Sequence, residues 1–258
     1  MMNMMAAFMI VAGLFVGLVQ ADEIALPDKS KVHVYLLMGQ SNMAGRGPLI
    51  EGDRDDVDGV IMLDKSDHWM PAHHPIHFDK PKIAAFGLAL PFAKQMKQQA
   101  GDGMVIALVP CAFGGTPLSR WVKGGDLYEN AVRRAKIAAK DGVIMGMIWH
   151  QGEADSGSPR NETYGSRIAG MIASLRDDLH KPKLPVVVGE LGYFFVNKSK
   201  GAAKVNEALN DLHNHVAHTA CASAEGLGHK GDTTHFDREA LVKFGHRYAE
   251  AMIKLQHK

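Results

Sequence analysis

Short apolar runs alternate with longer amphipathic stretches along most of this chain, and this alternation restricts its fold more than any other feature. Unbroken apolar runs are typical of strands buried on both faces, and alternating βα units form parallel sheets covered by helices. The predicted strands are Val34–Met38, Val60–Leu63, Met104–Val109, Val143–Trp149 and Leu184–Val188. The predicted helices are Phe86–Gln99, Leu127–Lys140, Thr163–His180, Ala202–Val216 and Arg238–Gln256, with Asp126 and Asp237 as N-caps. We therefore expect one α/β domain with a five-stranded, mostly parallel sheet.

The first apolar run ends in the turn Gly39-Gln-Ser-Asn42. Ser41 then lies just beyond the carboxyl end of a strand, where open α/β sheets bind their ligands. Its N–H would point, with the other amides of a helix start, toward developing negative charge. This is a suitable position for a nucleophile, although an N-cap serine in an ordinary βα turn has the same pattern.

The residues of this turn are less common than its geometry. Gly39-Gln-Ser-Asn-Met-Ala-Gly45 resembles the nucleophile block of the SGNH hydrolases, in the branch of sialate O-acetylesterase-like domains and family 6 carbohydrate esterases. The G-x-S-x-G elbow of α/β-hydrolases does not fit, because Met43 stands two residues after Ser41. The resemblance implies a three-layer α/β/α sandwich with a flavodoxin-like sheet, and an attack by Ser41 on an ester carbonyl.

Two later blocks carry candidate donors to an oxyanion. Paired glycines, Gly114 and Gly115, follow the third predicted strand and allow a backbone amide to approach a bound oxygen closely, although many such pairs only turn the chain. The resemblance implies that Gly115 supplies this amide beside the N–H of Ser41, with Gly114 as the near alternative. In the block Trp149–Glu153 it implies that the carboxamide of Gln151 is a third donor.

The block Gly231–Asp237 pairs a carboxylate with an imidazole. Asp232 and His235 are three residues apart before the last predicted helix, so Asp232 can accept from one ring nitrogen while the other faces a serine. The resemblance makes His235 the general base. In some members of the branch the orienting acid is the Glu that here is Glu153. We favour Asp232, because it shares a short turn with His235, and expect His150 to have a packing or supporting part.

The resemblance implies a carbohydrate O-acetylesterase that forms an acyl-enzyme and needs no cofactor. Its substrate would be acetylxylan or a related glycan, or an O-acetylated sialic acid. Gln40, Asn42, Arg46 and Trp121 are the residues predicted to bind this substrate. The alternatives are an SGNH esterase or lipase for short-chain esters other than sugars, and an inactive carbohydrate-binding descendant. The inactive descendant is disfavoured, because a protein that only binds sugars does not need Ser41, His235 and the oxyanion donors.

The N-terminal segment predicts export. Residues 1–21 contain no charged side chain, and the segment ends Val19-Gln-Ala21, a pattern typical of cleavage after Ala21. We expect a signal peptide at 1–21, a single esterase domain at 22–258, and a secreted or periplasmic protein without stable membrane association after cleavage. An uncleaved anchor is the alternative, because no Lys or Arg precedes the apolar run.

The rest of the composition limits the partners. A formal net charge of +1 without a basic run predicts no nucleic-acid binding. Cys111 and Cys221 would meet an oxidising compartment, where a disulfide and two free thiols are both open. His73, His74 and His77 share a proline-containing loop, where we expect solvated rings and assign no metal. The sequence leaves the oligomeric state open.

Overall fold

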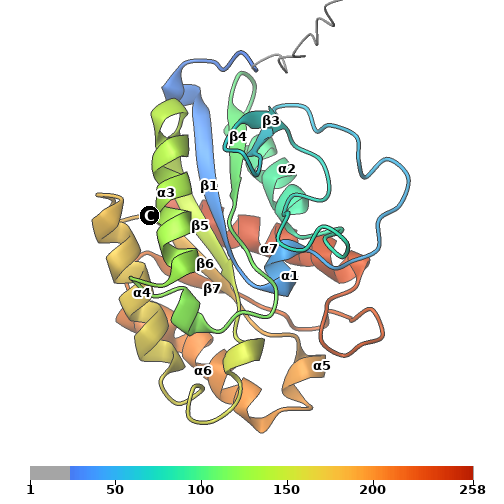
Figure 1. Ribbon diagram of the computed structural model, residues 1–258, viewed down its shortest axis with the longest axis vertical. Helices are drawn as coiled ribbons and strands as arrows, with labels where there is room; N and C mark the ends of the chain where they lie inside the picture. The colour runs from blue at the N-terminus through green and yellow to red at the C-terminus, as the bar shows by residue number, and fades with distance from the viewer. Residues whose placement is uncertain (1–23, 258) are drawn as a thin grey trace, which may run out of the picture.

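A central sheet carries the architecture (Figure 1), and the computed structural model describes residues 24–257. The strands are β1 (Val32–Gly39), β2 (Val60–Leu63), β3 (Trp69–Pro71), β4 (Val105–Pro110), β5 (Val143–His150), β6 (Val186–Gly189) and β7 (Thr219–Ala222). They lie in the order β3-β2-β4-β1-β5-β6-β7, and only the pair β2–β3 is antiparallel. The prediction of an α/β fold with a mostly parallel sheet is confirmed.

The predicted number of strands was wrong, because the sheet has seven. All five predicted runs are strands, but β3 and β7 were missed; β3 has three residues, and β7 reads Thr-Ala-Cys-Ala without a long apolar run. The order β4-β1-β5-β6-β7 corresponds to the flavodoxin-like order 2-1-3-4-5, so β7 is part of the expected core. The hairpin-like pair β2 and β3 extends that core at the edge of β4.

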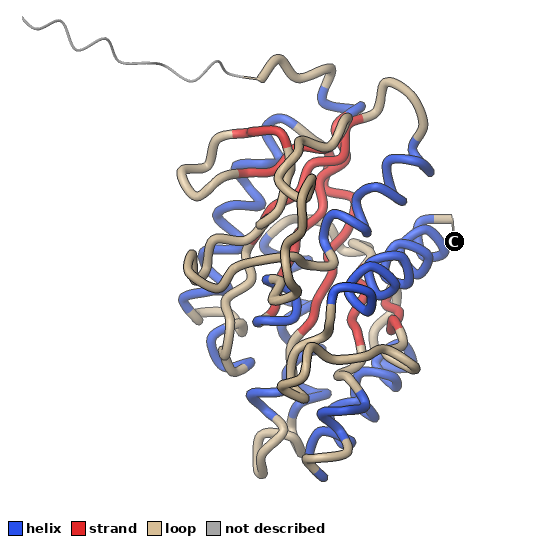
Figure 2. Tube along the Cα trace, turned by 90° about the vertical axis from the view of Figure 1, so that its right-hand side faces the viewer, coloured by secondary structure: helices blue, strands red, loops and turns tan. Residues whose placement is uncertain are grey.

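Helices cover both faces of the sheet, as Figure 2 shows with the strands between them. The helices α2 (Ala89–Ala100) and α7 (Arg238–Gln256) pack on one face. The other face carries α3 (Asp126–Asp141), α4 (Tyr164–Asp178) and α6 (Lys200–His215), while α1 (Ser41–Ala44) and α5 (Tyr193–Val196) are short. Asp237 caps α7 by accepting the N–H of Ala240, as predicted. Asp126 does not cap α3: it is the first helical residue, after the N-cap Gly125.

The central strand β1 explains why the nucleophile turn lies in the middle of the sheet edge. Val34, Leu36 and Met38 pack into the core on one face, whereas Tyr35 and Leu37 pack into the core on the other. Side chains of a strand alternate between faces, so a strand between two helical layers must be apolar at every position. β1 lies between β4 and β5, at the point where the strand order reverses and open sheets bind ligands.

The two cysteines are far apart. Cys111 follows β4 and Cys221 lies in β7, with β1, β5 and β6 between them, and both thiols are free. Four strand spacings of ~4.8 Å separate them by about 19 Å, well beyond the ~7 Å that a disulfide allows. Cys111 and Cys221 therefore do not form a disulfide.

The predicted signal peptide at 1–21 lies outside the described residues. Within residues 24–257, no helix has both the length and the apolar character needed to cross a membrane.

Candidate active site

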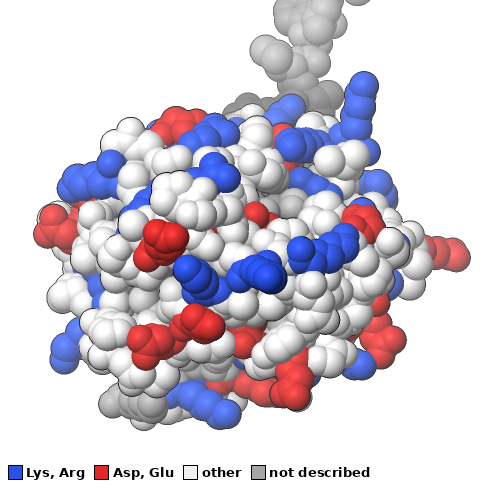
Figure 3. Space-filling view, turned by 90° about the horizontal axis from the view of Figure 1, so that it is seen from below, with Lys and Arg blue, Asp and Glu red and all other residues white. Residues whose placement is uncertain are grey.

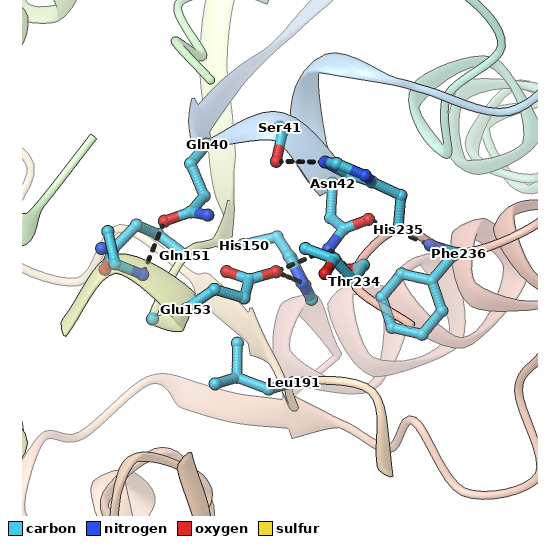
Figure 4. A network of polar contacts seen from close by, with 12 residues as sticks. Gln40, Ser41, Asn42, His150, Gln151, Glu153, Leu191, Thr234, His235 and Phe236 are labelled. Carbon is cyan, nitrogen blue, oxygen red and sulfur yellow. Dashed lines mark hydrogen bonds and ion pairs between the residues drawn. The ribbon is translucent and has the colours of Figure 1, made fainter. Parts of the chain in front are cut away.

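Ser41, His235 and Asp232 lie in one hydrogen-bonded chain at the carboxyl edge of the sheet. Oγ of Ser41, at the start of α1, is 3.0 Å from Nε2 of His235, although 194 residues separate them (Figure 4). On the other side of the ring, Nδ1 is 2.7 Å from Oδ2 of Asp232. Such a chain allows proton transfer from the serine to the imidazole while the carboxylate holds the ring.

The local turn before α7 explains the position of Asp232. Its Oδ1 accepts the N–H groups of Thr234 at 3.0 Å and His235 at 2.8 Å, which leaves Oδ2 for the ring. Burial alone would raise the pKa of Asp232, but the backbone N–H and ring of His235 and the N–H of Thr234 hold that pKa well below its usual range. Asp232 is therefore a carboxylate at any pH at which the imidazole can act as a base.

Glu153 lies in a different place from the one that the alternative interpretation requires. It is buried in the 3₁₀ turn Glu153–Asp155, where its Oε1 is 2.5 Å from Nδ2 of Asn42 and 3.7 Å from Nε2 of His150. Burial raises its pKa, but the neighbouring His150, a backbone N–H and the side chain of Asn42 together lower it more, so the net pKa is below its usual value. Within residues 24–257, this carboxylate forms no hydrogen bond or ion pair with His235. Its position therefore does not fit the role of the orienting acid.

Two backbone amides are free to bind an oxyanion. Within the described residues, the N–H groups of Ser41 and Gly115 have no acceptor. The N–H of Gly114 is already taken, because it donates to Oδ2 of Asp79 at 2.8 Å, so the near alternative is ruled out. A Cβ on Gly114 would lie 3.4 Å from Cβ of Ser41, which shows that this turn packs directly against the nucleophile.

Asp79 was missed by the sequence analysis, although it shapes this turn. Its fully buried side chain accepts from Gly114 and forms an ion pair of 2.7 Å with Arg46. Asp79 is the single Asp of the loop segment between β3 and α2, and the residues around it carry no sequence signal of such a contact.

The prediction that Gln151 supplies the third oxyanion donor was wrong. The residue is completely buried, and both protons of its amino group are used: Nε2 donates to the carbonyl of Thr116 at 3.0 Å and to Asp155 at 2.6 Å. Its Oε1 accepts from the hydroxyl of Tyr164 at 3.1 Å. Gln151 therefore ties three segments together inside the core and has no free N–H for an oxyanion.

Three of the four residues predicted to bind substrate also turned out to be structural. Trp121 is fully buried, packs edge-to-face on Trp149 and donates to Thr116. The guanidinium of Arg46 is held by Asp79 and by the carbonyl of Gly45.

Asn42, the third of these residues, is only 2% exposed and uses its whole carboxamide in three hydrogen bonds. Gln40 is as buried, at 3% exposed, but within residues 24–257 only the carbonyl of its side chain is bonded, to the N–H of Ala154 at 3.4 Å. It stays a predicted substrate contact.

Two of the three histidines of the proline-containing loop were also predicted wrongly, whereas His73 is partly exposed. His74 and His77 are both 2% exposed instead of solvated. His150 is fully buried, as its expected packing role requires, with Nδ1 at 3.1 Å from the hydroxyl of Tyr248. Within residues 24–257 no three His, Cys, Asp or Glu side chains gather in a way that would hold a metal ion.

The face around the triad carries several basic side chains. Figure 3 shows this face, onto which the strands' carboxyl ends open, with a band of Lys and Arg across its middle. Lys80 lies beside Gly115, since a Cβ there would be 4.0 Å from Nζ. Nζ of Lys230 is 3.8 Å from Oδ2 of Asp232, and Nζ of Lys198 is 3.5 Å from its carbonyl. Anionic groups are attracted to such a rim.

Known proteins are similar to this chain in sequence and in fold. The family described as "Carbohydrate esterase, sialic acid-specific acetylesterase" matches residues 31–254, a range that contains the whole site. A probable carbohydrate esterase of Arabidopsis thaliana is 32% identical over 241 residues, which are 85% of this chain and 90% of that protein.

The similar solved structures include two that are matched over nearly their whole length. The X-ray structure of an Arabidopsis thaliana protein has a TM-score of 0.81 at 31% identity, covering 88% of this chain and 99% of its own. The crystal structure of NanS has a TM-score of 0.76 at 18% identity, with 89% and 98% covered, and shows the shared fold alone.

Proposed function

Because the chain belongs to the sialic acid-specific acetylesterase family of carbohydrate esterases, we propose that it is an exported enzyme that removes O-acetyl groups from sugars through an acyl-enzyme on Ser41. The observation that carries this proposal is the chain Asp232–His235–Ser41, with hydrogen bonds of 2.7 and 3.0 Å, beside two unoccupied backbone N–H groups. A protein that only binds sugars has no need of this combination, so we favour an active enzyme over an inactive descendant.

The geometry supports a two-step reaction. Nε2 of His235 removes the proton of Ser41 as Oγ attacks the acetyl carbon, and the N–H groups of Ser41 and Gly115 receive the negative charge of the tetrahedral oxygen. The imidazolium is stabilised by Asp232 and then protonates the departing sugar hydroxyl. Water, activated by the same imidazole, attacks the acetyl-serine and releases acetate.

The basic rim favours an acidic sugar. Lys80 beside the oxyanion turn and Lys198 and Lys230 beside Asp232 surround the nucleophile with positive charge. A carboxylate on the sugar would gain from this field, whereas neutral acetylxylan would not. We therefore propose O-acetylated sialic acid in preference to acetylated xylan, and keep short-chain esters of other alcohols as the second candidate.

A hydrolysis panel tests the proposal. The purified protein is assayed on O-acetylated sialic acids, acetylated xylo-oligosaccharides and p-nitrophenyl esters of increasing acyl length, with Ser41→Ala as the blank. We expect acetate to be released fastest from the acidic sugar at low ionic strength, with this advantage declining as salt screens the rim. Faster cleavage of octanoate than of acetate would assign the protein to lipase-like chemistry. No turnover and no labelling of Ser41 by a fluorophosphonate would support the binding protein.

A further inference from the structure

Asn42, the residue after the nucleophile, reaches across to both sides of His235. Its Nδ2 donates to the carbonyl of Thr234 at 3.0 Å, and its Oδ1 accepts the N–H of Phe236 at 3.2 Å (Figure 4). These two groups belong to the residues immediately before and after the histidine. One buried carboxamide thus ties the backbone on both sides of His235 to the turn that carries Ser41.

Glu153 determines how this carboxamide is turned. Its Oε1 is 2.5 Å from Nδ2 of Asn42, and an ionised carboxylate can only accept hydrogen bonds. The amino end of Asn42 must therefore face Glu153 and Thr234, which leaves the carbonyl end for Phe236. The net pKa of Glu153 lies below its usual value, despite burial that raises it, so the carboxylate form is the one present at neutral pH.

Behind Glu153 the network continues into the core. The hydroxyl of Tyr248 donates its proton to the carbonyl of Trp149 at 2.8 Å, so its oxygen must accept from Nδ1 of His150 at 3.1 Å. The other ring nitrogen, Nε2, faces Oε1 of Glu153 at 3.7 Å, which is too far for a hydrogen bond. The side chains of His150 and Tyr248 are fully buried, so Glu153 rests on a rigid part of the core.

We propose that Asn42 is a positioning residue that sets the distance between His235 and Ser41, and that Glu153 acts through Asn42 by holding its carboxamide. The proposal rests on the proposed function. It separates two tasks: Asp232 orients the imidazole ring, whereas Asn42 places the backbone that carries the ring. Displacing a catalytic group by ~1 Å lowers turnover by about 10².

The test compares variants that break the two links. Asn42→Ala removes both ties to the histidine segment, and we expect kcat to fall about 10²-fold, with KM changed by less than about threefold. Glu153→Ala should cause a similar loss. Glu153→Gln keeps an oxygen that accepts from Asn42, so we expect it to restore turnover to within about tenfold of the wild type. If Asn42→Ala is recovered unfolded, the two Glu153 variants decide.

A matched control separates positioning from stability. Asn206 is also a buried asparagine that binds backbone on both ends of its carboxamide, to the N–H of Leu191 at 2.7 Å and its carbonyl at 3.0 Å. Asn206→Ala should lower the melting temperature to a similar extent and leave kcat unchanged. The acid limb of the pH–rate profile should keep its midpoint in Asn42→Ala, since Asp232 still holds the ring.

The outcomes are distinguishable. Wild-type hydrolysis together with an Asn42→Ala variant of unchanged kcat would overturn the positioning role alone. An inactive Glu153→Gln with a normal fold would also overturn it, because it would give the Glu153 carboxylate a direct part. A wild-type protein that neither hydrolyses acetyl esters nor reacts at Ser41 would overturn the proposed function and this inference with it.

Discussion

The carboxylate of Asp232 binds His235 twice: one oxygen accepts the backbone N–H at 2.8 Å and the other accepts from Nδ1 of the ring at 2.7 Å. This double contact fixes both the backbone conformation of the histidine and the plane of its imidazole. It needs only a turn of four residues, so the orienting acid and the base are positioned by the same short segment.

Replacing Asp232 by Asn should therefore reduce turnover strongly while leaving the fold intact. The carboxamide oxygen can still accept the backbone N–H groups, but the amino end would face Nδ1 and favour the tautomer with its proton on Nε2, pointing at Ser41. We expect a loss on the order of 10⁴ in kcat. Acetyl ester hydrolysis measures it, with circular dichroism as the folding control. Near-wild-type activity beside an inactive Glu153→Gln would transfer the orienting role to Glu153.

The pH dependence should follow the imidazole and not the acid. Hydrogen bonds that outweigh the effect of burial keep the pKa of Asp232 far below the assay range, so this carboxylate does not titrate there. Activity should fall where protonation of His235 stops the ring from accepting the serine proton. The pH–rate profile of acetyl ester hydrolysis measures this dependence. A wild-type optimum near pH 4 would contradict this mechanism.

The buried pair Asp79–Arg46 should support both the oxyanion turn and the fold. Asp79→Ala frees the N–H of Gly114 and leaves a guanidinium that is only 4% exposed without its partner. We expect kcat to fall by about 10²-fold and the free energy of unfolding by about 3–5 kcal/mol. The exposed pair of Glu239 with Lys243 is the control, and Glu239→Gln should leave the free energy of unfolding almost unchanged. Equal effects of the two variants would refute the special role of Asp79.

The two glycines of the oxyanion turn should respond differently to alanine. A Cβ on Gly114 would come within 2.6 Å of the Arg46 guanidinium and 3.1 Å of the Asp79 carboxylate, so this ion pair or the turn must shift. A Cβ on Gly115 meets only Nζ of Lys80 at 4.0 Å, and its φ of +78° adds backbone strain of about 1–2 kcal/mol. We expect Gly114→Ala to reduce kcat more than Gly115→Ala does, with the melting temperature of each recorded. The reverse order of kcat would show that the Gly114 turn tolerates displacement.

Buried histidines should make the fold sensitive to mild acid. Burial lowers the pKa of His74 to about 4 and that of His77 to about 3, against the opposing effects of Asp53 and Asp79. Below pH ~6.5 the two rings take up protons in the unfolded chain but stay neutral in the folded protein. The free energy of unfolding therefore falls by up to about 1.4 kcal/mol per pH unit for each ring. Denaturant titrations between pH 7 and pH 5 measure the slope.

His77→Leu removes one of the two titrating rings and should therefore reduce that slope. Leu can replace His77 without breaking a hydrogen bond, because neither ring nitrogen has a partner in residues 24–257. The exposed His213 is the control, and His213→Gln should leave the slope unchanged. A wild-type stability that is constant from pH 7 to pH 5 would contradict the burial of uncharged rings.

The sequence by itself determined the layered α/β fold, the position of Ser41 and the pairing of Asp232 with His235. Each of these is encoded in neighbouring residues: β1 is an unbroken apolar run from Val34 to Met38 because it is buried on both faces, and Asp232 and His235 share one turn. The strand β3 escaped prediction because it has only three residues, and β7 because Thr219–Ala222 is not an apolar run like the equally short β2 and β6. Both are defined as strands by their pairing with β2 and β6.

Only the tertiary structure decided what the polar and aromatic residues around Ser41 do. Asn42, Arg46, Trp121 and Gln151 have side chains that suit a sugar-binding surface and a buried network equally well. Their burial depends on partners that are distant in the chain: Asn42 meets Thr234 across 192 residues, and Gln151 meets Thr116 across 35. A buried donor must find an acceptor, and which acceptor it finds is determined by the packing of separate segments and not by the residues beside it.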